Sequence, residues 1–191
     1  MKMNNKYRVF THRTTLTNLA FAVVIGFTSL SAQAGSDKMV PKDGEITVPA
    51  DYRGWNKFVP TVEKEKAGQV REIYINEIGL KTQKGEAFPA GSLSVMEIYS
   101  AEKDANGKLL RNTEGSLVKG QLAKIFVMAK GSHWGSKLSE QTVKNGDWVY
   151  SAYQSDGQTP ATSDYTKCRS CHKPLADTDF VARYDEHFSA R

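Results

Sequence analysis

Both cysteines of this 191-residue chain lie in one short stretch near its C-terminal end, Cys168-Arg169-Ser170-Cys171-His172. Two thiols separated by two residues can each form a thioether with one vinyl group of a porphyrin, and a histidine directly after the second thiol is then held beneath the iron. The imidazole would serve as the proximal iron ligand. The motif therefore predicts one covalently attached haem c, with Cys168, Cys171 and His172 as cofactor-binding residues and His172 as the metal ligand.

Three other interpretations of the motif remain open but explain less of it. A thioredoxin-type dithiol requires a strand before the motif and a helix beginning at it, whereas Pro174 follows closely and no strand-helix-strand pattern surrounds the cysteines. A structural zinc site requires a second pair of ligands, and His133 and His187, the histidines left outside the N-terminal leader, are not paired. A disulfide between the two cysteines would leave His172 without a role.

The first 34 residues have the pattern of a secretory signal peptide. Four cations and no acid are followed by an apolar run over residues 16–30 and by the small-residue cleavage pattern Ala32-Gln33-Ala34. The alternative is an uncleaved membrane anchor, but the run is shorter than the roughly 20 apolar residues that a span requires. We therefore expect export to the periplasm, where haem c is attached, and no membrane association after cleavage.

The basic charge of the chain comes mainly from this leader. The formal net charge is +5, and four of the cations lie before residue 35, so residues 35–191 carry about +1. Such a chain lacks the clustered Lys/Arg footprint of a nucleic-acid binder. A local group of Lys167, Arg169 and Lys173 surrounds the motif, and we interpret it as a solvated face, as partners of the haem propionates, or as a surface that steers an acidic redox partner.

The rest of the chain predicts one α+β domain. Residues 35–48 are polar and indicate a mobile arm, and residues 49–191 form the predicted haem domain. Asp51 is the expected N-cap of a short helix that reaches Phe58. Strands are expected at residues 70–76, 92–99, 122–130 and 146–153, and a terminal helix at residues 179–188. Because no long helices separate the strands, we expect a curved, mainly antiparallel sheet, with the short N-terminal helix and C-terminal helices around a c-type haem.

The order of several short motifs resembles one known family. These motifs are Tyr52-Arg53-Gly54-Trp55, the run 71–76, the run 88–92, the strand end Met96-Glu97-Ile98-Tyr99, Gly146-Asp147-Trp148 and the late Cys-x-x-Cys-His. In this order they are similar to the cytochrome P-460 family, which includes the cytochromes c′-beta. The resemblance implies an antiparallel-sheet haem protein, usually a homodimer, with His172 as proximal ligand and an open or protected distal side.

One position departs from the family pattern. Members of the family carry a lysine on the second strand that is linked to the porphyrin and associated with hydroxylamine oxidation, and Met96 occupies that position here. A thioether cannot form the amine cross-link. Met96 either packs on the haem or core, as methionine commonly does, or serves as a sixth ligand. His133, in a loop after a strand, is interpreted as an exposed residue or as a distal ligand or proton donor.

Three functional hypotheses follow. The first is an oxidoreductase that acts on a small nitrogen compound such as hydroxylamine, or on peroxide, at a five-coordinate iron. The second is a binding protein for nitric oxide or carbon monoxide without turnover. The third is an electron-transfer cytochrome with a redox partner protein, in which Met96 or His133 closes the sixth position. The sequence favours the shared statement: an exported c-type cytochrome that binds or oxidises small nitrogen compounds.

Overall fold

The computed structural model describes residues 40–161 and 164–191. The predicted signal peptide and residues 35–39 of the predicted arm lie outside these residues. In the part that is described, no helix has the length and apolar character needed to cross a membrane.

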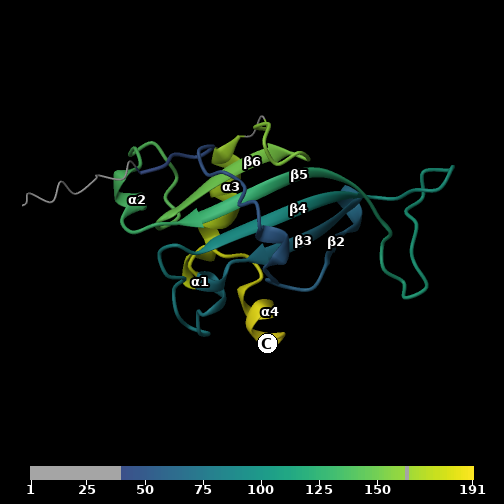
Figure 1. Cartoon of the computed structure of the whole chain (residues 1–191), viewed down its shortest axis with the longest axis horizontal. Coiled ribbons are helices and arrows are strands. Elements are labelled where there is room, and N and C mark those ends of the chain that lie inside the picture. The colour runs from purple at the N-terminus through teal and green to yellow at the C-terminus, as the bar shows by residue number, and fades with distance from the viewer. Residues whose placement is uncertain (1–39, 162–163) are drawn as a thin grey trace, which may run out of the picture. The chain divides into compact units, whose positions relative to one another are not determined.

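An antiparallel sheet forms the centre of the described domain (Figure 1). Its strands follow the order β1-β3-β4-β5-β6, and β2 also pairs with β3. The bounds are β1 Asn56–Lys57, β2 Val62–Lys64, β3 Gln69–Ile75, β4 Leu93–Ala101, β5 Lys119–Lys130 and β6 Trp148–Gln154. The four strands expected from the sequence are β3 to β6, and every neighbouring pair is antiparallel. The predicted α+β class is therefore confirmed.

The register assigns alternate residues to two faces with different coverings. One face carries Tyr74, Val95, Val127 and Tyr153, which are buried together with Tyr52 under Ile46, Val48 and Trp55. The other face carries Ile73, Ile75, Met128 and Tyr150, which pack with Cys168 of the motif and with Phe180 and Val181. The motif therefore lies on the second face, which we call the motif face.

The C-terminal segment covers part of the motif face. It contains α3 (Tyr165–His172), η3 (Lys173–Thr178) and α4 (Tyr184–Ser189). In Figure 1 its yellow ribbon passes behind the sheet from β6 toward β3 and ends at α4. Smaller helices lie in the connections: η2 (Glu65–Ala67), α1 (Glu77–Leu80) and α2 (Trp134–Lys137). Between β4 and β5, residues 102–118 form a long loop that extends beyond the end of the sheet.

Both predicted helices at the ends of the domain are shorter than expected. At the N-terminal end, η1 spans only Tyr52–Gly54, because strand β1 begins at Asn56. Asp51 makes no capping hydrogen bond, and its carboxylate accepts one from the indole Nε1 of Trp55 instead (3.1 Å).

The terminal helix begins at Tyr184, five residues after the predicted start. Asp179, Phe180 and Arg183 all have positive φ, between 50° and 61°, which an α-helix does not allow. The residues in between therefore form turns that lead the chain from η3 into α4.

Residues 43–46 of the predicted arm make specific contacts with β6. The amide of Gly44 donates to the carbonyl of Tyr150 (2.7 Å), and the amide of Ile46 donates to the hydroxyl of Ser151 (2.9 Å). Tyr153 returns a hydrogen bond from its hydroxyl to the Ile46 carbonyl (2.7 Å). This part of the segment thus covers the sheet as a component of the domain.

Candidate functional site

Helix α3 brings both thiols of the motif to one side. Asp164 caps the helix, since its carboxylate accepts from the amide of Thr166 (3.0 Å). Cys168 and Cys171 are three residues apart and thus neighbours on the helix surface. Cys168 is half-buried and packs against the core of the motif face, whereas Cys171 is exposed. The helix ends at His172, and Pro174 lies at the start of η3, as its lack of a backbone donor requires.

The imidazole of His172 is held in one tautomer. Its Nδ1 lies 2.7 Å from the carbonyl oxygen of Phe180. A carbonyl oxygen can only accept, so Nδ1 carries the proton and Nε2 keeps its lone pair. The ring also packs against Tyr150, with 5.3 Å between the ring centroids. A histidine oriented in this way leaves Nε2 available for iron ligation, and a hydrogen bond of this kind from the other ring nitrogen fixes the orientation of metal-bound histidines.

A small polar cluster fixes the Phe180 carbonyl. The preceding residue, Asp179, accepts from Lys130 Nζ (2.7 and 2.9 Å) and from the amide of Phe88 (2.9 Å) through its carboxylate. Its own carbonyl accepts from the indole Nε1 of Trp148 (2.8 Å). These three contacts come from β5, β6 and the loop before β4. They hold the turn at residues 178–181 against the sheet and so position the acceptor of His172.

Arg169 anchors α3 from between the two cysteines. Its side chain is 1% exposed, and its Nε and Nη2 donate to the two carboxylate oxygens of Asp43 (2.6 and 2.8 Å). The guanidinium also donates to the carbonyls of Val143 and Trp148, and the Asn145 amide donates to the Arg169 carbonyl. Of the three interpretations of the Lys167, Arg169 and Lys173 group, none fits Arg169, because its charge is buried and already paired.

The motif face has an uncovered apolar area beside α3. Ile73, Met96 and Phe126 are direct cross-strand neighbours on β3, β4 and β5, and all three are only half-buried. Met128, in the next row, is also half-buried. The opposite face shows no such gap along the same strands, since Val95, Ile125 and Val127 are 2% exposed or less. A flat apolar group placed here would remove these side chains from water, which is favourable.

The residues present therefore fit a haem. The thiols of Cys168 and Cys171 and the Nε2 of His172 lie on the side of the sheet that carries the half-buried apolar row. The hydroxyl of Tyr150, which packs on His172, is buried and has no hydrogen-bond partner among the described residues, and burial raises its pKa. A buried hydroxyl of this kind is a natural contact for a polar group brought in by a cofactor.

The other interpretations of the motif gain no support. Among the described residues, no cluster of three or more His, Cys, Asp or Glu could hold a metal ion. Cys168 and Cys171 are not joined in a disulfide. A thioredoxin-type dithiol lies at the start of a helix, whereas α3 begins three residues before Cys168 and ends one residue after Cys171.

The other candidate residues lie in different surroundings. Met96 is at the centre of the half-buried apolar row, on the motif face. His133 is exposed at the start of α2, and its backbone amide donates to Asp147. His187 is buried in α4, where its Nδ1 donates to the carbonyl of Phe58 and its ring stacks on the Phe58 ring.

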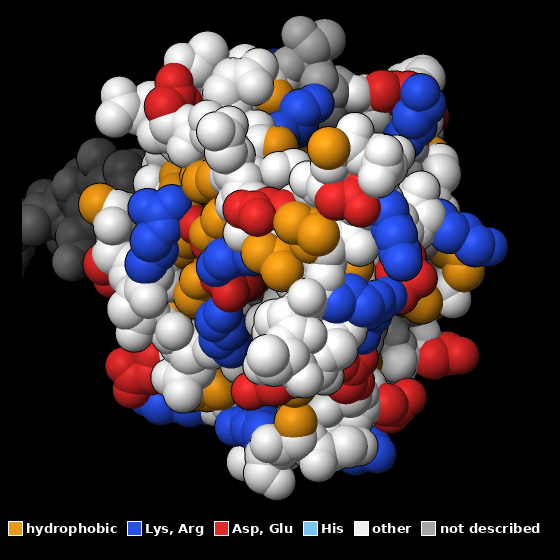
Figure 2. Space-filling view, turned by 90° about the vertical axis from the view of Figure 1, so that its right-hand side faces the viewer, with side chains coloured by type: hydrophobic (Ala, Val, Ile, Leu, Met, Phe, Trp, Pro, Cys, Tyr) orange, Lys and Arg blue, Asp and Glu red, His pale blue; other side chains and the backbone are white. Residues whose placement is uncertain are grey.

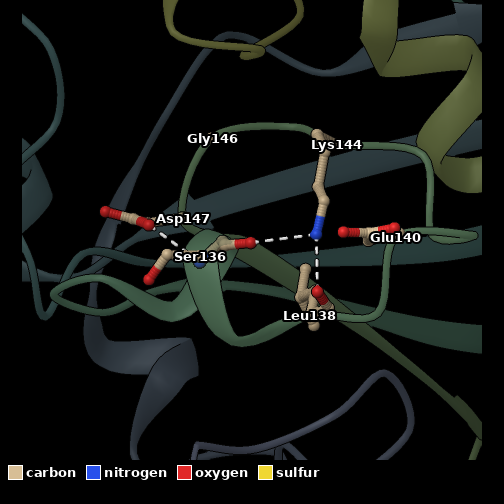
Figure 3. Close-up of a pocket in the computed structure, with 7 residues that line it drawn as sticks. Ser136, Leu138, Glu140, Lys144, Gly146 and Asp147 are labelled. Atoms are coloured by element: carbon tan, nitrogen blue, oxygen red, sulfur yellow. Dashed lines mark hydrogen bonds between the residues drawn. The ribbon is translucent and has the colours of Figure 1, made fainter.

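Figure 3 shows a cavity of about 490 Å³ in the loop between β5 and β6. Lys144 spans it and donates from Nζ to the carbonyls of Gly135 and Leu138 (3.1 and 2.6 Å). Neither cysteine of the motif lines this cavity. The same loop contacts α3 and η3 through two hydrogen bonds. The side-chain amide of Asn145 donates to the carbonyl of Arg169 in α3, and Lys173 Nζ of η3 donates to the carbonyl of Lys144. The cavity is therefore separate from the candidate haem site.

A second polar cluster lies on the opposite face of the sheet. The carboxylate of Glu97 is fully buried and accepts from the hydroxyls of Tyr52 and Tyr99 (2.5 and 2.7 Å) and from the guanidinium of Arg53. Burial alone would raise the pKa of Glu97, but these hydrogen bonds together bring it below its ordinary value. The cluster stabilises an ionised carboxylate where η1 packs against β4 of the sheet.

The comparisons with known proteins agree with the geometry of the site. The sequence profile of the family described as Cytochrome P460 matches residues 49–183, which include every strand of the sheet and the whole Cys-x-x-Cys-His motif. No curated protein matches the chain.

Proposed function

Because the chain belongs to the cytochrome P460 family, and is therefore a haem-binding cytochrome, we propose that it is an exported c-type cytochrome that binds or oxidises small nitrogen compounds at its haem iron. Cys168 and Cys171 form the two thioethers, and His172 is the proximal ligand. When bound, the haem supplies an iron that takes a small ligand and exchanges electrons.

The hydrogen bond between His172 Nδ1 and the Phe180 carbonyl carries this proposal. It leaves Nε2 as the only nitrogen able to bind iron, and the cluster around Asp179 keeps the ring in that orientation. The half-buried apolar row supports a position for the porphyrin on the motif face. The signal peptide pattern of residues 1–34 supports export to the compartment where haem c is attached.

Expression in cells that mature c-type cytochromes tests the haem attachment. The purified protein should be coloured, should keep its haem in acidified organic solvent, and should give an alkaline pyridine spectrum of a haem with two thioethers. Cys168→Ser and Cys171→Ser should each give the spectrum of a single thioether, while His133→Gln should behave like the wild type. A colourless wild-type protein, or haem that is fully extracted by the solvent, would contradict the proposal.

Ligand binding separates the three functional hypotheses. If the iron has an open site, the ferrous protein should bind nitric oxide and carbon monoxide without displacing a protein ligand. Oxidation of hydroxylamine with an added electron acceptor would support an enzyme, whereas binding without turnover would support a gas-binding protein. The absence of the family's lysine at Met96 favours binding over hydroxylamine oxidation.

The electron-transfer alternative rests on the position of Met96. Its half-buried side chain lies on the motif face among the apolar residues that would contact the porphyrin. If its thioether is the sixth ligand, the ferric protein should be low-spin and Met96→Ala should be high-spin. Met128→Ala removes a second half-buried methionine of the same face and is the matched control. A low-spin spectrum that Met96→Ala leaves unchanged would eliminate this version of the alternative.

A further inference from the structure

A basic row borders the apolar area of the motif face. Arg71 on β3, Ile98 on β4 and Lys124 on β5 are direct cross-strand neighbours. They lie on the same face as Ile73, Met96 and Phe126, because residues two apart on a strand point to the same side. The face therefore combines an apolar row with an adjacent row that holds a cation at each end. Two strand spacings, about 10 Å, separate the two cationic residues.

The charge of Arg71 has no acidic partner among the described residues. Its Nε and Nη2 donate to the side-chain oxygen of Gln69 (3.2 and 2.8 Å), a neutral group that orients the guanidinium. Burial, and then the nearby Arg183 guanidinium, lower the pKa of Arg71, yet an arginine stays charged at any physiological pH. A half-buried cation with a second cation beside it is costly unless an anion balances it. An anionic group at this position would remove that cost.

Lys124 is an exposed cation at the other end of the row. No ion pair involves it in the part of the chain that the structure describes. By contrast, Lys57 and Lys119 both pair with Glu72, and Lys130 pairs with Asp179. The two residues that border the apolar area are thus cations whose charge the surrounding protein leaves unbalanced.

We propose that Arg71 and Lys124 bind the two carboxylates of the porphyrin, so that the haem rests on the apolar row and its propionates meet the basic row. This inference rests on the proposed function and names side chains of that same site. A porphyrin is an apolar plate with two carboxylates, which is the complement of the surface described above. Arg71 binds one propionate carboxylate through a charge-assisted hydrogen bond, and its hydrogen bonds to Gln69 orient the guanidinium before the haem binds.

The assignment replaces the earlier interpretation of the cations around the motif. Arg169, which is closest to the cysteines in sequence, is neutralised by Asp43 and cannot serve the propionates. Arg71 and Lys124 lie 97 and 44 residues before Cys168, and only the register of the sheet places them on the face that the motif covers.

Resonance Raman spectra and the reduction potential of the purified holoprotein test the assignment. The variants are Arg71→Gln and Lys124→Gln, with Lys108→Gln, an exposed cation of the loop between β4 and β5, as the control of equal charge. The alkaline pyridine spectrum is recorded first and should show haem c in all four proteins. We expect the propionate bending bands to shift in Arg71→Gln and Lys124→Gln but not in Lys108→Gln. The potential should fall in the first two, because a cation near the iron disfavours the ferric state. Arg71→Lys should restore part of both effects.

Other outcomes overturn the assignment in distinguishable ways. Lys124 is exposed, so its variant folds and gives an answer even if Arg71→Gln does not. Propionate bands that match the wild type in both variants would refute the inference while leaving the proposed function intact. If nitrite binds the wild type and Arg71→Gln weakens that binding at least tenfold with unchanged propionate bands, the row serves an external oxyanion instead. A wild-type protein without haem would refute the proposed function and this inference together.

Discussion

The guanidinium of Arg169 joins the haem motif to a segment far away in sequence. It forms a bidentate ion pair with Asp43, which lies 126 residues earlier. It also lies over the aromatic ring of Tyr150 in a cation–π contact. Asp43 in turn accepts from the amide of Tyr150 (3.0 Å). The side chain between the two cysteines is therefore a structural anchor.

Loss of this anchor should destabilise the protein strongly. Arg169→Gln leaves Asp43 as a half-buried carboxylate without its cation, and breaking such a pair costs about 3–5 kcal/mol. Lys167→Gln, an exposed cation of the same helix, should change the free energy of unfolding by no more than about 0.5 kcal/mol. Urea unfolding of the holoproteins at pH 7 measures both. Equal stability of the two variants would contradict the role of Arg169.

Local sequence predicted the candidate cofactor-binding residues but not their anchor. Cys168, Cys171 and His172 form a pattern whose chemistry is complete within five residues. Arg169 belongs to a group of three neighbouring cations that looks like a solvated surface, and its partner can be found only once the chain is folded. The same limit applies to Arg71 and Lys124, because only strand pairing places them in one row, on either side of Ile98.

At the scale of elements, the strands follow the sequence and the helices do not. The alternation of residues 93–99 correctly predicted Val95 and Glu97 on one face and Met96 on the other, because the two-residue period is a property of any strand. The start of the terminal helix is set by Asp179, Phe180 and Arg183, which lie in the left-handed region. None of the three is glycine, so their sequence carries no signal for the turns.

These turns have a function, since they place the acceptor of His172. Asp179→Ala removes the ion pair to Lys130 and the acceptor of the Phe88 amide, and the turn should loosen. We expect a weaker bond from His172 Nδ1 to the Phe180 carbonyl and thus a less basic ligand nitrogen. The Fe–His stretching frequency should fall, the reduction potential should rise, and stability should drop by about 3 kcal/mol.

Asp177→Ala provides the control for this prediction. Asp177 lies two residues away in η3, is exposed and takes part in no ion pair of the described residues. Its replacement should leave the frequency and the potential unchanged. Resonance Raman spectroscopy of the ferrous proteins and potentiometry give the two readouts. A frequency in Asp179→Ala that equals that of Asp177→Ala would exclude a positioning role for the cluster.

At the scale of the whole molecule, most buried charges have a partner of opposite sign, and the candidate haem face differs in this respect. The face in Figure 2 carries Lys and Arg side chains interspersed with Asp and Glu, with small apolar areas between them. Buried charges elsewhere are matched in pairs, Arg169 with Asp43 and Lys130 with Asp179. Arg71 differs from these buried charges, because it is a half-buried cation without an ion pair among the described residues. Together with the exposed Lys124 it borders the apolar row, and this arrangement points to an anionic group from outside the chain.

The C-terminal helix packs on the rest of the domain through a buried histidine, which makes the stability of the whole molecule depend on pH. His187 is 1% exposed, its Nδ1 donates to the carbonyl of Phe58, and Arg191 lies beside its Nε2. Burial, and then repulsion by Arg191, lower the pKa of His187 below its ordinary value of 6.5. As the pH falls, His187 therefore takes up a proton in the unfolded chain before it does so in the folded protein. Below about pH 6.5 stability should fall by at most about 1.4 kcal/mol per pH unit, until the folded state is protonated as well.

Replacement of His187 should flatten this dependence. His187→Gln keeps a donor for the Phe58 carbonyl but cannot titrate, and His187→Phe keeps the stacked ring but loses the hydrogen bond, at a cost of about 1–2 kcal/mol at pH 7. Denaturant unfolding between pH 7 and pH 5 should give a smaller slope for both variants than for the wild type. This pH range is higher than the range in which Glu97 titrates. Because the pKa of Glu97 is lowered, its carboxylate loses its charge, and the protein loses the stability that this charge contributes, only at more acidic pH. If both variants kept the wild-type slope of unfolding free energy against pH, another group would take up the proton on unfolding. The packing of α4 on the domain would then not depend on the protonation of His187.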